Sequence, residues 1–209
     1  MSPLLANVVV DKFIEGGPVM WFLLVVMIVG IFVVLERTLW WVKISRSWDT
    51  PKLEQAIAAV RAGDNAKAGE LARDETCPGL ALVAEAVSHP REVMASAIQL
   101  SAAKQLGEAD RLIWLLGTVI TLAPLFGLLG TVTGIMVAFK GVGDAELAAA
   151  KVSGGIGEAL IATAYGLGIA IFAVIPFNIF RRRVVDLRHK LEHTANRIEV
   201  ALELAELRK

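Results

Sequence analysis

The chain has 209 residues, and its 21 basic and 21 acidic residues give a net charge of zero. Apolar residues, with glycine counted among them, make up about 64% of the chain, against about 45 to 50% in soluble domains. A neutral chain lacks the basic surface that nucleic-acid binders need, so this class is excluded. The apolar excess argues against an ordinary soluble protein.

Three stretches contain no charged residue: 16–35, 112–139 and 159–180. About 20 apolar residues at a rise of 1.5 Å per residue cross a hydrocarbon core of about 30 Å. We therefore predict an all-α membrane protein with three transmembrane helices, at 16–35, 112–139 and 153–180. The first is predicted to be a retained span and not a secretory signal, because Asp11 and Glu15 precede it and Glu36 and Arg37 replace a small-residue cleavage site.

The basic residues predict the orientation of the spans. Ten of them lie between residues 36 and 111, eight follow residue 180, and three lie elsewhere. Since cytoplasmic segments accumulate Lys and Arg, we expect the N-terminus to lie outside. The predicted order is a short periplasmic segment at 1–15, a cytoplasmic helical domain at 36–111, a short periplasmic loop at 140–152 and a cytoplasmic helical tail at 181–209.

The cytoplasmic domain shows helix boundaries and no strand alternation. Thr50 before Pro51 is the predicted N-cap of one short helix. Between residues 91 and 140 the sequence has no proline except Pro124, so one helix of about 50 residues, or about 75 Å, is expected there. Two of the three long helices should then extend far into the cytoplasm.

The tail after residue 181 repeats apolar or small residues at alternating steps of three and four. Such a stripe is typical of a helix that packs against partner helices, and the alternative is an amphipathic helix lying on its own subunit. The members of this tail stripe are Val184, Leu187, Leu191, Thr194, Ile198, Ala201 and Ala205.

Small residues and hydroxyls mark the second span. Gly130 and Gly134, four residues apart, let helix backbones approach closely, and we assign Gly127 and Pro124 to the same packing face. Most threonines in a span bond the carbonyl one turn back. Thr131 and Thr163, however, lie at similar predicted depths, some 12 to 15 Å below the outer surface, where two hydroxyls could flank a polar path.

Glu158 is an ionisable residue near the start of the third span. Carboxylates within the membrane are costly and usually face a cavity, a partner or a proton route. The alternative is that Glu158 starts the helix at the interface, after a turn at residues 153–155, where the helix dipole favours it. Glu158 and Thr163 are about 140° apart around a helix, so both cannot point straight into one narrow pore.

No arrangement of residues indicates an enzyme or a cofactor. The single cysteine, Cys77, cannot form an intramolecular disulfide, and no metal-ligand spacing is recognisable. His189 and His193 are four residues apart on a charged tail, where an exposed pair is more common than a metal site.

Two long segments resemble the proton-channel subunits of the ExbB, TolQ and MotA family. They are TLAPLFGLLGTVTGIM at 121–136 and GIGEALIATAYGL at 155–167. GGPVMW at 16–21 and LER at 35–37 are supporting matches. The order of the spans fits over essentially the whole chain, and three spans resemble the ExbB branch first and the TolQ branch next.

The resemblance implies a homopentamer in the bacterial inner membrane, with lipids around it. A single-span subunit like ExbD or TolR would supply a transmembrane aspartate, and a TonB-like or TolA-like protein would be energised. Glu158, Thr131 and Thr163 match the family's membrane glutamate and pore threonines, so the resemblance implies proton coupling at these residues. A gliding or secretion motor and a passive membrane scaffold remain alternatives.

Overall fold

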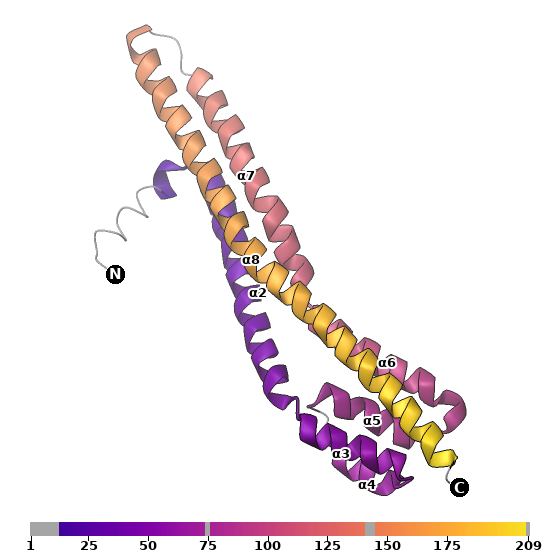
Figure 1. Ribbon diagram of the computed structural model, residues 1–209. Helices are drawn as coiled ribbons and strands as arrows, with labels where there is room; N and C mark the ends of the chain where they lie inside the picture. Colours follow the sequence, from indigo (N-terminus) through magenta and orange to yellow (C-terminus); the bar gives the residue numbers. More distant parts are fainter. Residues whose placement is uncertain (1–12, 74–75, 141–144, 208–209) are drawn as a thin grey trace. The chain divides into compact units, whose positions relative to one another are not determined.

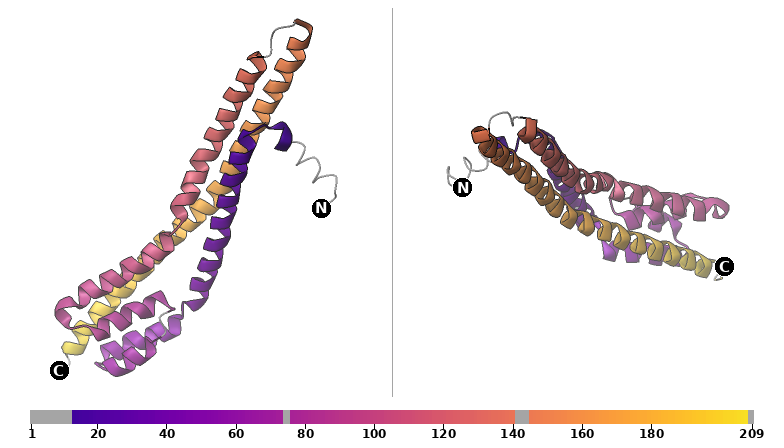
Figure 2. Two further views of the ribbon diagram at one scale, coloured as in Figure 1. Left: turned by 180° about the vertical axis from the view of Figure 1, so that it is seen from behind. Right: turned by 90° about the horizontal axis from the view of Figure 1, so that it is seen from above.

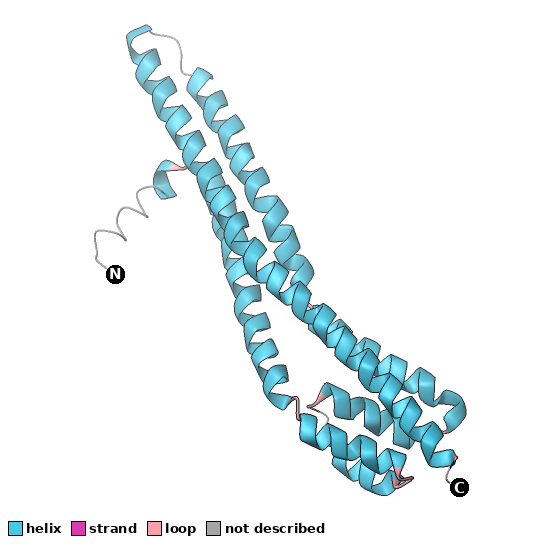
Figure 3. Cartoon of the chain, in the orientation of Figure 1, coloured by secondary structure: helices cyan, strands magenta, loops and turns pink. Residues whose placement is uncertain are grey.

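The computed structural model describes residues 13–73, 76–140 and 145–207, and its regular elements are all helices (Figure 3). Three helical stretches are long and apolar enough to cross a membrane: Val19–Ser47, Arg91–Phe139 and Ser153–Glu206. The predicted fold class, an all-α membrane protein with three such helices, is confirmed. Residues 1–12 of the predicted N-terminal segment and 141–144 of the predicted loop lie outside the described residues. The helices are α2 (Val19–Ser47), α3 (Thr50–Arg61), α4 (Asn65–Leu71), α5 (Pro78–Ser88), α6 (Arg91–Asp110), α7 (Ile113–Lys140) and α8 (Ala145–Glu206).

The chain divides into two compact units. The first, here called the apolar unit, comprises Met1–Leu35 and Leu112–Ile179, and the second, the polar unit, comprises Glu36–Arg111 and Phe180–Lys209. Each unit has its own core. The division follows the sequence closely, since the charge-free windows fall almost wholly within the apolar unit.

The apolar unit is built from the first part of α2, α7 and the first part of α8. Helices α7 and α8 run side by side through it (Figures 1 and 2). Its core gathers Met20 and Leu23 of α2, Ala123 of α7 and Ala162 of α8. Many of its large apolar side chains are exposed, as is typical of a surface that faces lipid or other chains.

Helices α3 to α6 make up the polar unit, together with the last parts of α2 and α8. Asp49 caps α3 by accepting a hydrogen bond from the Lys52 amide at 3.0 Å, so the predicted cap at Thr50 is one residue too late. The tail stripe is buried by this chain, which corrects the expectation of partner helices: α8 lies on its own subunit. Its buried members are Leu187, Leu191, Thr194, Ile198 and Ala201.

Two helix boundaries differ from the predictions. The expected helix from residue 91 to 140 is divided into α6 and α7, because Leu112 adopts φ 64°. That left-handed conformation is incompatible with a continuous α-helix and costs a leucine about 1 to 2 kcal/mol. Helix α8 begins at Ala145, so residues 145–152 of the predicted loop are helical.

Candidate functional site

The backbones of α7 and α8 are in close contact along a face of small residues on α7. A Cβ atom added to Gly127 would lie 3.0 Å from Thr163 Cα, and one added to Gly130 would lie 2.6 Å from Ala162 Cβ. At Gly134 it would lie 3.0 Å from the Gly155 carbonyl oxygen. These positions therefore leave no room for a larger side chain.

Helix α8 contributes two glycines of its own to the same contact. A Cβ on Gly155 would lie 2.6 Å from Ala138 Cβ, and one on Gly166 would overlap the Ala123 carbonyl oxygen. Pro124, directly after Ala123, is half-buried within α7. Gly155 and Gly166 were not predicted as packing residues, although both belong to the motif at 155–167 and small residues in spans favour close helix packing.

Thr163 joins the two helices with a hydrogen bond. Its hydroxyl donates to the carbonyl oxygen of Gly127 at 2.8 Å, and its side chain is half-buried. Since a hydroxyl that donates one hydrogen bond still has two lone pairs, Thr163 can also accept a hydrogen bond from another group. The Thr163 hydroxyl and the Gly127 carbonyl thus form a polar contact between two otherwise apolar helices.

Thr131 makes a different kind of contact. Its hydroxyl donates to the carbonyl oxygen of Leu128, one turn back in its own helix, at 2.6 Å. Among the described residues, Thr131 and Thr163 form no hydrogen bond with each other. Thr131 does lie one helical turn from Gly127, the acceptor of the Thr163 bond, so both hydroxyls are near the same part of α7.

Glu158 faces the turn that precedes helix α2 of its own chain. A Cβ added to Gly17, in the turn before α2, would overlap Glu158 Oε1 and lie 2.8 Å from its Cδ. The carboxyl group therefore packs against the Gly17 backbone, whereas Thr163 faces α7. This difference agrees with the 140° that separates Glu158 and Thr163 around the helix.

The alternative that Glu158 lies at the start of its helix is wrong. Residues 153–155, the supposed turn before it, are helical, and α8 begins at Ala145. Glu158 therefore lies well inside the helix, away from the free amide groups of the first turn. Its position has to be explained by its neighbours and not by the end of its own helix.

No metal centre is formed within the described part of the chain, where no three His, Cys, Asp or Glu side chains gather. His189 Nδ1 lies 3.7 Å from a carboxylate oxygen of Glu192, and both side chains are exposed. Cys77 is a buried free cysteine.

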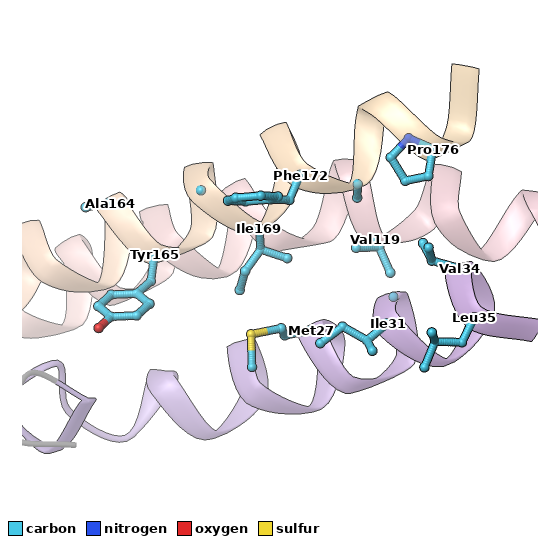
Figure 4. A pocket seen from close by; sticks show the side chains of 13 residues that line it. Met27, Ile31, Val34, Leu35, Val119, Ala164, Tyr165, Ile169, Phe172 and Pro176 are labelled. Atoms are coloured by element: carbon cyan, nitrogen blue, oxygen red, sulfur yellow. The ribbon is translucent and has the colours of Figure 1, made fainter. Parts of the chain in front are cut away.

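A cavity of about 650 Å³ lies between α2 and α8 in the apolar unit (Figure 4). Its walls include Met27 and Ile31 of α2, Val119 of α7, and Tyr165 and Phe172 of α8. The Tyr165 hydroxyl is the single polar side-chain group among its lining residues. Glu158, Thr131 and Thr163 do not line it, so the candidate proton-handling groups lie elsewhere.

Comparison with known proteins shows the family. Residues 75–193 match the MotA/TolQ/ExbB proton channel family. The putative biopolymer transport protein ExbB-like 1 of Synechocystis is 37% identical over 177 residues, covering 81% of this chain and 69% of that protein. The chain therefore belongs to the MotA/TolQ/ExbB proton channel family, and is a multi-pass membrane protein.

Two further relatives match over shorter segments. The biopolymer transport protein ExbB of Neisseria gonorrhoeae is 43% identical over 81 residues, 38% of this chain and 37% of its own length. The Tol-Pal system protein TolQ of Pseudomonas aeruginosa is 42% identical over 93 residues, 44% of this chain and 40% of its own length. These matches cover well under two thirds of either relative.

Proposed function

We propose that this chain is the proton-channel or stator subunit of an inner-membrane motor, which uses the proton motive force to energise a TonB-type partner for outer-membrane transport. The observation that carries the proposal is the Thr163 hydroxyl, bonded to the Gly127 carbonyl at 2.8 Å, with Glu158 on the same helix. The similarity to proteins named ExbB and ExbB-like supports the uptake role.

The proposed assembly is a homopentamer that surrounds a single-span subunit of the ExbD or TolR type and lies among membrane lipids. That partner would supply a transmembrane aspartate, and none of the three charge-free windows of this chain contains one. A proton from the outer side would bind the aspartate near the threonines and leave toward the cytoplasm. Thr163 and Thr131 would accept and donate hydrogen bonds without holding a fixed charge.

The experiment is a pair of substitutions, Thr163→Ala and Glu158→Ala, in cells that depend on proton-driven uptake. We expect either variant to abolish uptake while the complex still assembles. Thr133→Ala is the matched control, because the Thr133 hydroxyl bonds only its own helix, at the Leu129 and Gly130 carbonyls. Full proton-dependent uptake in either test variant would overturn the assigned site.

The alternative within the family is a TolQ-like subunit for envelope maintenance, or a gliding or secretion motor. The similarity to the P. aeruginosa TolQ favours it. Native mass spectrometry of the complex from its own membranes separates these roles. A TonB-like protein in the complex supports uptake, and a TolA-like protein supports the alternative.

A passive membrane scaffold is the second alternative, and the glycine contacts between α7 and α8 favour it, since they need no further role. The copy number of this chain and the presence of a single-span partner together distinguish the motor from the scaffold. Five copies with a single-span partner that carries a membrane aspartate support the motor, whereas an intact complex without such a partner supports the scaffold.

A further inference from the structure

We propose that Gly17 is a positioning residue for Glu158: the turn before α2 holds the Glu158 carboxyl group against a backbone that only glycine can provide. The inference rests on the proposed function, in which Glu158 handles protons. It adds the amino end of α2 to the groups that control that carboxyl group.

The turn itself is well defined by backbone hydrogen bonds. The Gly17 amide donates to the Ile14 carbonyl at 3.4 Å, and the Gly17 carbonyl accepts from the Met20 amide at 3.1 Å. Gly17 has φ +74°, a left-handed conformation that other residues adopt at a cost. Backbone conformation is therefore the first reason for glycine at this position.

The second reason is space. A methyl group on Gly17 would overlap Glu158 Oε1 and lie 3.3 Å from Glu158 Cγ, so the whole end of the side chain would have to move. The backbone is also in close contact at the neighbouring Gly16, where an added Cβ would lie 2.6 Å from Met20 Cγ and 3.2 Å from Ile161 Cγ2. A methyl group on Gly17 would therefore force the carboxyl group away from the position it has against this backbone.

Charged residues are sparse along the segments that form this contact. Helix α7 has no charged residue from Ile113 to Phe139, and α8 has none between Glu158 and Phe180. Before Glu158, the next charged residue on α8 is Lys151, about two helical turns away in the sequence. On the segment that carries the turn, Glu15 is the nearest charged residue in the chain, and its side chain is exposed. The Gly17 backbone is thus a main local determinant of where the Glu158 carboxyl group lies.

The test is Gly17→Ala in the full assembled complex, with Gly63→Ala as the matched control. Gly63 has φ +77° but open space around its Cα, so its alanine variant carries the backbone strain without the contact. The probe is a hydrophobic carbodiimide, which modifies protonated carboxyl groups. Labelling of the Glu158 peptide is followed by mass spectrometry as a function of pH, with other carboxyl groups as internal references.

We expect Gly17→Ala to shift the pH midpoint of Glu158 labelling and to lose most proton-driven activity, with Gly63→Ala unchanged in both. Glu158→Asp should restore part of the activity of Gly17→Ala, because the shorter side chain leaves room for the methyl group. If Gly17→Ala does not assemble, Gly17→Asn replaces it, since asparagine tolerates positive φ and still adds a Cβ.

An unchanged pH midpoint of Glu158 labelling in an assembled Gly17 variant would overturn the inference, whether or not Glu158→Asp restores activity. The proposed function fails separately. If Glu158→Gln keeps full proton-driven activity, Glu158 is not on the proton route, while a shifted midpoint in Gly17→Ala would still support the positioning contact.

Discussion

The Thr163 hydroxyl donates to the Gly127 carbonyl oxygen at 2.8 Å, at a point where the backbones of α7 and α8 touch. A Cβ on Gly127 would lie 3.0 Å from Thr163 Cα, so the absence of a side chain at Gly127 allows the two backbones to approach. This approach brings the Thr163 hydroxyl within hydrogen-bonding distance of the Gly127 carbonyl. The same residue pair therefore combines helix packing with a polar group inside the membrane-spanning part of the chain.

Replacing Thr163 with valine should remove this hydrogen bond while keeping the size of the side chain. Interhelical hydrogen bonds in membranes contribute about 0.6 to 2 kcal/mol, so we expect the free energy of unfolding to fall by about that much. Proton-driven activity should be lost, whereas Thr163→Ser, which keeps the hydroxyl, should retain most of it. Thermal unfolding of the purified complex and an uptake assay in cells measure the two effects.

Thr133→Val is the control for this prediction. The Thr133 hydroxyl donates to the Leu129 carbonyl at 2.9 Å within its own helix, so its loss should leave α7 and α8 in contact. Equal activity in Thr163→Val and the wild type would show that the interhelical bond has no part in coupling.

Gly166→Ala should destabilise the contact between α7 and α8 from the other side. Its Cβ would overlap the Ala123 carbonyl oxygen, a backbone atom that cannot rotate away. Overpacking of this kind costs about 1 to 3 kcal/mol, measurable as a lower unfolding temperature.

Gly168→Ala is the matched control, two residues further along α8. Gly168 has open space where a Cβ would lie, beside the cavity between α2 and α8. Alanine is the better helix former by about 0.5 to 1 kcal/mol, so this variant should be neutral or slightly more stable. A Gly166→Ala protein as stable as Gly168→Ala would show that the backbones do not approach as described.

The helical spans could be predicted from the sequence because a charge within the hydrocarbon core is costly. Long uncharged windows such as 112–139 therefore indicate membrane-spanning helices. The helix break at Leu112 could not be predicted from the sequence. Helix breaks are predicted from proline, glycine and capping residues, and a leucine at φ 64° carries none of these signals.

The candidate site was predictable only in part. The residue types and the spacing within α8 identified Glu158 and Thr163 and predicted that they face different directions. Their neighbours are distant in the sequence: Gly17, in the turn before α2, is 141 residues from Glu158, and Gly127 of α7 is 36 residues from Thr163. No local pattern encodes such pairs, because they depend on how the helices pack.

Arg37 should be sensitive to a conservative substitution. It is 1% exposed, its Nη1 donates to the Glu108 carbonyl at 2.8 Å, and its guanidinium lies 5.1 Å from the Trp40 ring centroid. It also pairs with Glu36. Lysine cannot reproduce the planar fork of donors, so Arg37→Lys should lower the free energy of unfolding by about 1 to 3 kcal/mol.

Arg46→Lys is the control for Arg37, because Arg46 belongs to the same helix and is exposed. It should change the unfolding temperature little. If both variants unfold at the wild-type temperature, the buried guanidinium contributes no net stability.

The ion pair between Glu54 and Arg197 predicts a weak dependence of stability on acid. Arg197 Nη1 donates to Glu54 Oε1 at 2.6 Å, and its Nη2 bonds the other carboxylate oxygen. This hydrogen bonding lowers the pKa of Glu54 from its ordinary value. The stabilising contribution is therefore fully present above the pKa of the unfolded chain and is lost as the pH falls through the lower pKa of the folded state.

Thermal unfolding of wild type and Arg197→Gln between neutral and acidic pH measures this contribution. Because the carboxylate is exposed, solvent screens the pair and the difference should be small. The wild type should be the more stable at neutral pH, and the two curves should converge in acid. Glu199→Gln changes another exposed carboxylate of α8 and should show no such convergence. A constant difference between wild type and Arg197→Gln at every pH would mean that Arg197 acts through packing and not through the charge of Glu54.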